Sequence, residues 1–380
     1  MTKIRVLVAD DSAFMRKVIS DILESDSSIE VVSRVRNGEE CLNKVKEVSP
    51  DVITLDVEMP VMDGLATLER LQEEYPVPVV MLSNVTKEGA DATVRALQLG
   101  AFDFVNKPSG AISLDIHKVG QNIVEMVKQA AESRKQRNSV KVIEELKSDS
   151  ITPLPSLVKK RTTTRVIRQE VPSTKKLNVE QRIERSDGSL KKLVLLGTST
   201  GGPRALQTLL PDIPVDFPAP ILIVQHMPPG FTKSLAQRLD TLCAITVKEA
   251  EQGEEILAGT AYIAPGGYHM EVEQQSNGSL YIKLHQAEPK GGHRPSVDVM
   301  FMSASQLKRI RQWAVILTGM GADGTEGLQN LKASVQVTGL IEDQSTCVVF
   351  GMPRAAIHAG LADYVVPLNK MADTLVRLVT

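Results

Sequence analysis

The sequence contains little cysteine and no long apolar run. The three cysteines are Cys41, Cys243 and Cys347. They form no Cys-x-x-Cys pair, which argues against a disulfide framework or a zinc knuckle. No apolar run approaches the roughly 18 residues that a membrane span requires. The short apolar segment Ile4–Ala9 meets Asp10 at once, which a secretory signal peptide would not do. We therefore expect a cytoplasmic protein without membrane insertion.

The chain also lacks a strong excess of charge of either sign. It has 44 Lys and Arg against 46 Asp and Glu, so its formal net charge is −2. This balance does not favour a nucleic-acid or membrane partner. An apolar content of 42% with 24% charged residues is typical of a folded globular protein. A length of 380 residues exceeds one ordinary core, which predicts two domains and connecting material.

A change of composition in the middle of the chain predicts where the connecting material lies. Residues 132–192 include 16 basic and 8 acidic residues, and several prolines interrupt any helical pattern there. We assign residues 129–190 to a linker that is flexible for most of its length. Its positive charge could bind an acidic partner or only keep the segment solvated, and solvation is the favoured interpretation.

Residues 1–128 alternate short β-branched apolar segments with helical patterns. Five such units predict an α/β domain with a doubly wound parallel sheet and helices on both faces. The expected strands are Ile4–Ala9, Glu30–Val35, Val52–Leu55, Val77–Leu82 and Phe102–Val105. The expected helices are Ser12–Glu24, Glu39–Val48, Leu65–Glu74, Ala90–Leu99 and Ile116–Ala131.

Polar residues follow every one of these strands except the second. Because the carboxyl ends of parallel strands share one edge of a sheet, Asp10, Asp11 and Asp56 are expected to converge there. Three carboxylates repel one another unless a cation compensates, and Mg²⁺ suits an open carboxylate site. Ser83 and Lys107 follow two other strands and would suit a phosphoryl group opposite that metal. Any one of these residues alone is more often a turn residue, but the full set is a strong signal.

At these residues the sequence resembles the receiver domain of response regulators, over residues 1–128. The resemblance implies that Asp56 is the phosphoacceptor and that a histidine kinase is the phosphodonor. The implied Mg²⁺ ligands are Asp11 and Asp56, with Asp10 in support and the backbone carbonyl of Glu58 as a further ligand. The positions implied to respond to the phosphoryl group are Ser83, Lys107 and Phe104, the last as an aromatic switch.

The βα alternation returns over residues 191–380, which predicts a second α/β domain. Between its second and third strands we expect a β-rich insert, with Asn277-Gly278 as a hairpin turn. The expected strands of the sheet are Leu193–Leu196, Ile221–Gln225, Trp313–Thr318, Val335–Ile341 and Tyr364–Val366. Those of the insert are Thr260–Ile263, His269–Glu273 and Ser279–Leu284.

Ser199 lies in a glycine-rich turn between the first of these strands and a helical pattern that opens at Pro203. Gly197, Ser199 and Gly201 fit the Gly-x-Ser-x-Gly pattern, in which glycines permit a sharp turn that exposes the serine hydroxyl. The pattern alone leaves two alternatives about equally open, a nucleophile and a loop that binds an anion at a helix N-terminus. A purely structural turn is a third.

Two further polar residues follow strands at the same predicted edge. His226 follows the second strand, and Asp323 lies in the glycine-rich segment TGMGADG after the third. With Ser199 they would supply a nucleophile, a base and a residue that orients the base. The sequence therefore offers a candidate catalytic trio.

Alternatives to this trio remain open. The alternative base is His293, and the alternative orienting acids are Asp298 and Asp343. An aspartate before a glycine, as at Asp323, is also typical of a turn. The remaining histidines, which have no neighbours that suggest catalysis, are His117, His269, His285 and His358. The order Ser, His, Asp also differs from the order Ser, acid, His of α/β-hydrolases, so membership of that fold is not expected.

Five segments of the second domain resemble the catalytic domain of chemotaxis protein-glutamate methylesterases. They are GTSTGGP, QHMPPGFT, APGGYHM, GHRPSVDVMF and LTGMGADG. The resemblance covers residues 191–380, and a receiver followed by an esterase is also that family's domain order. It implies Ser199 as nucleophile, His226 as base and Asp323 as acid. The residues implied to line the site are Thr200 and Met320. The linker is longer than the family usually has.

The resemblance also implies an activity and partners. Phosphorylation would activate the hydrolysis of glutamate γ-methyl esters on methyl-accepting chemotaxis receptors, and receptor glutamines would be deamidated. No cofactor is implied for ester hydrolysis. The main rival is a DNA-binding regulator, but the second domain shows no compact helix-turn-helix with a basic helix. An NAD-binding fold is disfavoured because Ser199 stands where Gly-x-Gly-x-x-Gly has its second glycine.

Overall fold

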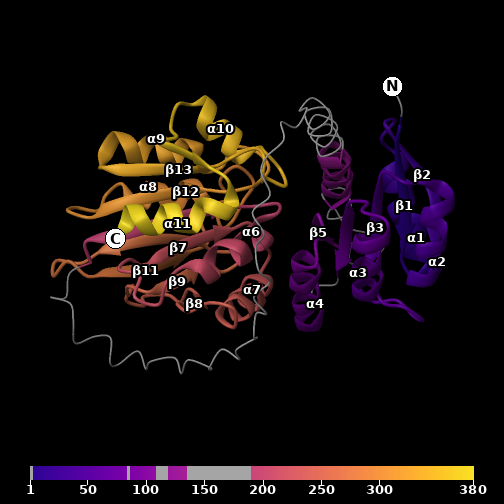
Figure 1. Cartoon of the computed structure of the whole chain (residues 1–380), viewed down its shortest axis with the longest axis horizontal. Coiled ribbons are helices and arrows are strands. Elements are labelled where there is room, and N and C mark those ends of the chain that lie inside the picture. Colours follow the sequence, from indigo (N-terminus) through magenta and orange to yellow (C-terminus); the bar gives the residue numbers. More distant parts are fainter. Residues whose placement is uncertain (1–2, 84–85, 108–118, 135–189) are drawn as a thin grey trace, which may run out of the picture. The chain divides into compact units, whose positions relative to one another are not determined.

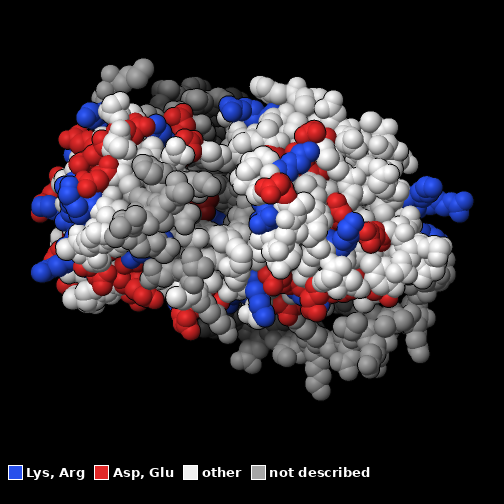
Figure 2. All heavy atoms as spheres, turned by 180° about the vertical axis from the view of Figure 1, so that it is seen from behind, with Lys and Arg blue, Asp and Glu red and all other residues white. Residues whose placement is uncertain are grey.

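The computed structural model describes residues 3–83, 86–107, 119–134 and 190–380. Residues 135–189, which make up most of the predicted linker, lie outside these ranges. Among the described helices, none is long and apolar enough to cross a membrane. On the face shown in Figure 2, acidic and basic side chains are interspersed, in keeping with their nearly equal numbers in the sequence.

The N-terminal part of the chain forms a five-stranded parallel sheet with the strand order β2-β1-β3-β4-β5 (Figure 1). The strands are β1 (Ile4–Ala9), β2 (Ile29–Val35), β3 (Val52–Asp56), β4 (Val79–Ser83) and β5 (Asp103–Asn106). The helices are α1 (Ala13–Glu24), α2 (Gly38–Val48), α3 (Gly64–Glu74) and α4 (Lys87–Gln98), and residues 119–134 are also helical. The doubly wound sheet expected from the βα alternation is confirmed.

Alternate strand residues pack against different helices, because successive side chains of a strand point to opposite faces. One face carries α2, α3 and α4, whose apolar residues cluster with Leu7 and Leu55. The other face carries α1 and the helical segment 119–134, which cluster with Val6 and Val8. Each of the four labelled helices begins after a side chain that accepts a first-turn backbone N–H. These N-caps are Ser12, Asn37, Asp63 and Thr86.

The C-terminal part forms a seven-stranded sheet with the order β14-β13-β12-β6-β7-β9-β8, in which every pair is parallel. Its strands are β6 (Lys192–Thr198), β7 (Ile221–Gln225), β8 (Thr246–Glu249), β9 (Thr260–Ile263), β12 (Arg311–Ile316), β13 (Val337–Glu342) and β14 (Tyr364–Val366). Separate from it, β10 (His269–Gln274) and β11 (Leu280–His285) form an antiparallel hairpin. The helices are α6 (Gly202–Leu209), the 3-10 turn η3 (Leu210–Asp212), α7 (Phe231–Asp240), α8 (Val297–Ala304), α9 (Thr325–Ser334), α10 (Met352–His358) and α11 (Leu368–Val379).

This second sheet is also covered on both faces. Val194 and Leu196 of β6 cluster with residues of α6, α7 and α11. Leu193 and Leu195, which point the other way, cluster with residues of α8, α9, α10 and the β10–β11 hairpin. The strands of a parallel sheet that is buried on both faces are expected to be almost continuously apolar, as β6 and β7 are.

One prediction about the insert is wrong. Thr260–Ile263 is β9, which pairs in parallel with β7 and β8 of the main sheet and is not part of the insert. A short apolar run has the same pattern in either sheet, so periodicity alone does not assign it. Strand β8 has no counterpart among the expected strands. The other two insert strands do form the expected hairpin, and Gly278 in its turn has a φ of +91°.

The strand order places the candidate trio at one edge of the sheet. Strand β6 has β7 on one side and β12 on the other, so the order of the chain reverses there. In open α/β sheets, the crevice beyond the carboxyl ends of the strands at such a point is the usual ligand site. Ser199 directly follows β6, His226 directly follows β7, and Asp323 lies between β12 and α9. The shared edge expected from the sequence is therefore present.

Candidate functional site

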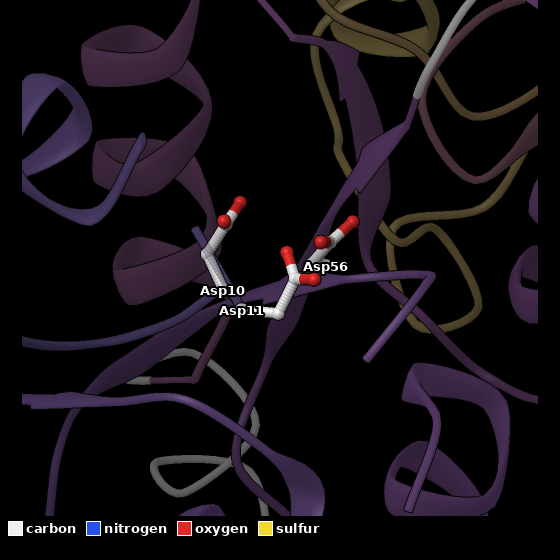
Figure 3. Close-up of side chains that lie close together, drawn as sticks. All are labelled: Asp10, Asp11 and Asp56. Carbon is white, nitrogen blue, oxygen red and sulfur yellow. The ribbon is translucent and has the colours of Figure 1, made fainter. Parts of the chain in front are cut away.

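The carboxylates of Asp10, Asp11 and Asp56 lie together at the carboxyl edge of the N-terminal sheet. Asp10 and Asp11 directly follow β1, and Asp56 ends the neighbouring strand β3. Figure 3 shows the three side chains close together, and one oxygen of each lies within 4.8 Å of the others. Asp10 and Asp56 are buried, whereas Asp11 is exposed. A hollow of about 590 Å³, lined in part by Asp11 and Glu58, opens at this cluster.

Lys107 offsets part of the negative charge of this cluster. Its ammonium nitrogen lies 2.8 Å from Oδ2 of Asp10 and 2.6 Å from Oδ2 of Asp56. Burial raises the pKa of Asp56 to about 6, although the ammonium of Lys107 acts to lower it. Burial acts to lower the pKa of Lys107, but the two carboxylates raise it above its ordinary value. One lysine against three carboxylates leaves the negative charge in excess, so this donor set fits a divalent cation such as Mg²⁺.

The other residues expected to respond to a phosphoryl group, Ser83 and Phe104, lie on the neighbouring strands β4 and β5. Ser83 ends β4 and is buried, and its hydroxyl oxygen accepts a hydrogen bond from the Thr93 hydroxyl at 2.7 Å. Phe104 lies on β5. The backbone N–H of Glu58 donates to Oδ1 of Asp56 at 3.4 Å. These positions are compatible with the predicted roles, which stay predictions.

The turn that carries Ser199 requires glycine at several points. Gly201 has a φ of +80° and precedes the first residue of α6. A Cβ on Gly202 would lie 1.9 Å from Oε1 of Gln225, so a larger residue does not fit there. The backbone N–H of Ser199 donates to the carbonyl of Thr318, which lies just beyond the end of β12, at 3.0 Å. This backbone hydrogen bond to the loop after β12 therefore fixes the position of the candidate nucleophile.

The side chains of Ser199, His226 and Asp323 form one hydrogen-bonded chain. Nδ1 of His226 lies 3.2 Å from Oγ of Ser199, and Nε2 of the same ring lies 2.8 Å from Oδ2 of Asp323. Nδ1 thus faces the serine and Nε2 faces the acid, which is the reverse of the arrangement in chymotrypsin-type triads. The trio expected from three distant segments of the sequence is brought together in the structure.

Five donors surround the carboxylate of Asp323. They are the ring of His226, the hydroxyl of Ser296 and the backbone N–H groups of Val297, Asp298 and Gly324, at 2.7 to 3.0 Å. Burial acts to raise the pKa of Asp323, but His226 and the backbone donors outweigh it and hold the pKa below its ordinary value. This carboxylate is therefore ionised at neutral pH and able to orient the His226 ring.

The two alternative acids have other partners. Oδ1 of Asp298 accepts the backbone N–H groups of Gly324 at 2.9 Å and Gly327 at 2.6 Å, so this side chain caps the N-terminus of α9. Burial raises the pKa of Asp298 to about 6. Asp343 accepts from the backbone N–H and the hydroxyl of Ser345, as turn aspartates do. The structure thus favours Asp323 as the orienting acid.

His293, the alternative base, lies against the face of the His226 ring. The two ring centroids are 3.9 Å apart and the ring planes differ by 6°. Burial, assisted by the neighbouring His226, lowers the pKa of His293 to about 4. Of the remaining histidines, His269 and His285 belong to the β10–β11 hairpin and His358 ends α10, while His117 lies outside the described residues.

The loop after β12 comes very close to Ser199. A Cβ on Gly319 would lie 2.9 Å from Cβ of Ser199 and 2.3 Å from Sδ of Met352, so only glycine fits without a shift. Met320, which the resemblance implied as a residue that lines the site, follows Gly319 directly, and this role stays a prediction. Within the described part of the chain, the backbone N–H groups of Thr200 and Met320 have no hydrogen-bond acceptor. Both are therefore available to a negative oxygen bound near Ser199.

Three buried polar residues that were not predicted from the sequence also hold this site. They are Gln225, Thr318 and Glu342. Nε2 of Gln225 donates to the backbone carbonyls of Ser199 at 3.0 Å and His226 at 3.3 Å. The backbone N–H of Thr318 donates to Oε2 of Glu342 at 2.7 Å, and Glu342 is fully buried. Gln225 and Glu342 are the last residues of β7 and β13. A polar residue at the end of an apolar strand is the signal that could have indicated Gln225 and Glu342.

Comparison with known proteins covers both parts of the chain. The CheB methylesterase family matches residues 194–375, and the response regulator receiver domain family matches residues 6–117. A protein-glutamate methylesterase/protein-glutamine glutaminase of Oceanobacillus iheyensis is 50% identical over 384 residues, which cover 100% of both chains. Its counterpart in Bacillus subtilis is 44% identical over 99% of this chain and 98% of the relative. The crystal structure of the Thermotoga maritima CheB methylesterase catalytic domain is 49% identical, with a TM-score of 0.48, over 50% of this chain and 100% of that one. The chain belongs to the protein-glutamate methylesterase/protein-glutamine glutaminase family, with a receiver domain before a CheB methylesterase domain.

Proposed function

We propose that this protein hydrolyses glutamate γ-methyl esters on methyl-accepting chemotaxis receptors and deamidates receptor glutamines, under the control of receiver phosphorylation. The names of its relatives support the ester and amide substrates. The observation that carries the proposal is the hydrogen-bonded chain from Asp323 through His226 to Ser199. Such a chain activates a serine hydroxyl for acyl transfer.

The reaction begins at Ser199. Its Oγ attacks the ester carbonyl carbon while Nδ1 of His226, 3.2 Å away, takes the hydroxyl proton. His226 then gives this proton to the methoxy oxygen, the C–O bond to that oxygen breaks, and methanol leaves an acyl-enzyme. Water, deprotonated by the same nitrogen, attacks the acyl carbon. The bond from this carbon to Oγ of Ser199 then breaks, His226 returns the proton to Oγ, and the glutamate side chain leaves as a carboxylic acid that ionises. Asp323 on Nε2 keeps Nδ1 free to accept a proton and stabilises the imidazolium that forms.

The negative charge of the tetrahedral intermediate needs donors that are already in place. The backbone N–H groups of Thr200 and Met320 are the candidates, because Thr200 follows the nucleophile and Met320 follows the glycine that touches it. An oxyanion that receives two backbone N–H groups is stabilised strongly in a site of this kind. The side chains of both residues are proposed to line the site.

A glutamine side-chain amide presents the same carbonyl as a glutamate methyl ester. Ammonia replaces methanol as the leaving group, and it receives the proton from His226 in the same way. The acyl-enzyme and its hydrolysis are then identical for the two substrates. One site therefore accounts for both activities in the names of the relatives.

In the receiver domain, we propose that Asp56 accepts a phosphoryl group from a chemotaxis histidine kinase. Asp11, Asp56 and the backbone carbonyl of Glu58 would hold Mg²⁺, with Asp10 in support. The cation would offset the repulsion between the carboxylate and the incoming phosphoryl group. The cluster of three carboxylates supports this assignment.

Two further receiver positions are proposed to respond to the phosphoryl group. The ammonium of Lys107 already contacts Asp56 at 2.6 Å, so a phosphoryl oxygen on that residue would be within its reach. Ser83 ends the strand beside β3, and its hydroxyl is the second proposed contact. Phe104 on β5 is the proposed aromatic switch.

Phosphorylation is proposed to raise esterase activity by favouring one arrangement of the two domains over another. The proposed limits are residues 1–128 for the receiver, 129–190 for the linker and 191–380 for the esterase. The simplest form of control is that the unphosphorylated receiver restricts access to the esterase site and phosphorylation relieves this. A cytoplasmic location and ester hydrolysis without a cofactor stay predictions.

The proposed activity is tested by methanol release from methylated receptor membranes, with wild type and Ser199→Ala compared. We expect release by wild type and a loss of several orders of magnitude in the variant. A second serine in the same domain, Ser345→Ala, serves as the control because that hydroxyl donates to the turn residue Asp343 and carries no proposed role. Equal release by wild type and Ser199→Ala would remove Ser199 as the nucleophile.

A further inference from the structure

Residues 290–298, which comprise the end of the connection from the β10–β11 hairpin and the first two residues of α8, contact two members of the proposed triad. Ser296 and the backbone N–H groups of Val297 and Asp298 donate to the Asp323 carboxylate. His293, from the same segment, stacks on the base at a centroid distance of 3.9 Å. The proposed steps of ester hydrolysis assign the stacked His293 ring no role.

A tight turn fixes the position of the His293 ring. The backbone N–H of Lys290 donates to the carbonyl of His293 at 3.1 Å, and the reverse bond is 3.0 Å long. The two residues between them, Gly291 and Gly292, have φ values of +59° and +85°. Both positive φ values are those of a two-residue hairpin turn, which favours glycine. The ammonium of Lys290 lies 3.1 Å from the Glu326 carboxylate on α9, which ties the turn to the helix that follows Asp323.

The His226 ring needs a support of this kind. The outer torsion of a histidine side chain is broad, so the rotamer alone does not set the ring plane. Its Nδ1 is bonded to Ser199 and its Nε2 to Asp323. These two hydrogen bonds still allow the ring to tilt about the line that joins the two nitrogens. A second ring, parallel within 6° against one face, blocks that tilt.

We propose that His293 is a positioning residue whose flat face holds the His226 imidazole in the plane where Nδ1 meets Ser199 and Nε2 meets Asp323. The inference rests on the proposed function only in taking Ser199 as the nucleophile and His226 as its base. His293 acts through His226 and does not itself transfer a proton. Among the described residues, no hydrogen-bond partner of the His293 ring is found, and its face, not its edge, meets the base.

The chemistry of the ring fits this role. Burial keeps the pKa of His293 at about 4, so the ring is neutral at neutral pH. When His226 takes the serine proton it becomes a cation, and a neutral aromatic face beside a cation is attractive. A lysine or arginine in the same place would repel that cation. The role therefore needs a neutral planar side chain, which phenylalanine also supplies and leucine does not.

The test compares three variants: His293→Phe, His293→Leu and His293→Ala. His358→Ala is the matched control, because His358 ends α10 and carries no proposed role. The first measurement is the rate at which a fluorophosphonate labels the activated serine in the full chain. We expect labelling to fall roughly 10²-fold in the Leu and Ala variants, the loss that a misplaced catalytic group causes, and to stay within about threefold of wild type in the Phe variant.

The second measurement is hydrolysis of receptor methyl esters, where kcat is expected to fall and KM to stay unchanged. Two outcomes would overturn the proposal. If His293→Phe is labelled as slowly as His293→Ala, the ring nitrogens matter and His293 is more than a flat support. If all three variants label within about threefold of wild type, the stack has no function. The comparison of Phe with Leu still decides if the Ala variant fails to fold.

The labelling assay also separates this inference from the proposed function. A fluorophosphonate needs only an activated serine, so a wild-type chain that labels but does not demethylate receptors contradicts the substrate assignment and leaves the role of His293 testable. A wild-type chain that is not labelled at all contradicts both.

Discussion

Replacement of Asp323 by asparagine separates the charge of this residue from its shape. An amide carries one acceptor oxygen and one NH2 donor, whereas the carboxylate accepts at both oxygens. In the structure Oδ1 faces the Ser296 hydroxyl and the backbone N–H groups of Asp298 and Gly324, and Oδ2 faces Val297 N–H and the His226 ring. The variant must therefore turn its NH2 toward one of these two sets.

The backbone donors decide which way the amide turns. An NH2 at the Oδ1 position would face two backbone N–H groups, those of Asp298 and Gly324, whereas one at the Oδ2 position faces only that of Val297. With the NH2 at the Oδ2 position, fewer N–H donors face another donor, so this orientation is favoured. The NH2 then donates to Nε2 of His226. The ring proton must move to Nδ1, so the ring can no longer accept the proton of Ser199. The variant is expected to fold normally with its base in the wrong tautomer.

The expected loss in kcat is about 10⁴-fold, as for the equivalent change in a serine protease triad. This corresponds to about 5 kcal/mol of barrier. Initial rates of methanol release from methylated receptor measure it, and Asp343→Asn, a turn aspartate, is the control. A variant that kept more than about a tenth of the wild-type kcat would refute the tautomer argument.

The same variant tests a pH dependence of stability. The pKa of Asp323 is lower in the folded chain than in the unfolded chain, where it is about 4. Its ionised form therefore stabilises the fold fully above about pH 4, and this contribution is lost as the pH falls toward the folded value. We expect the difference in thermal unfolding between wild type and Asp323→Asn to shrink from pH 6 to pH 3. A difference that stays constant over this range would contradict the assignment.

Three other predictions concern the receiver and the serine loop. Asp56→Asn is expected to abolish phosphate incorporation, and EDTA is expected to prevent it in wild type; stable incorporation in EDTA would rule out the metal requirement. Gly319→Ala should lower kcat at least about tenfold, because the new methyl group meets Ser199 and Met352. Gly120→Ala is the control and should leave kcat unchanged, because its Cβ would lie 3.4 Å from the nearest neighbour. The fragment 191–380 should demethylate receptors faster than the unphosphorylated full chain, and equal rates would exclude control by restricted access.

Much of the fold followed from the sequence because parallel sheets carry a local signal. Each strand that is buried on both faces is an apolar run, and in each helix between two strands apolar residues recur with the helical period. The polar residue after each run then marks the shared edge, and this is why Asp56 and Ser199 could be placed there from their positions alone. The same reasoning failed for Thr260–Ile263, since a run of four residues does not say which sheet it joins.

The pattern of residues alone did not decide between His226 and His293 as the base, although the family resemblance implied His226. Both lie in loops near glycines, and both could reach a serine at the sheet edge. The difference arises from geometry that is not local: His226 follows β7 directly, whereas His293 is turned by the Gly291-Gly292 hairpin onto the face of the first ring. Residue type and spacing are the same for an imidazole edge and an imidazole face, so only the structure distinguishes them.

Gln225 holds the backbone of both Ser199 and His226, but the other supports of the proposed triad come from separate parts of the chain. Ser199 is held by the carbonyl of Thr318, whose own N–H is bound by the buried carboxylate of Glu342. His226 and Asp323 are instead supported by residues 290–298. Damage to that segment should therefore impair proton transfer while the serine stays in place. Damage at Glu342 should displace the nucleophile while the His226–Asp323 bond survives. Double variants that combine one change from each group should lose activity additively in free energy if the two supports are independent.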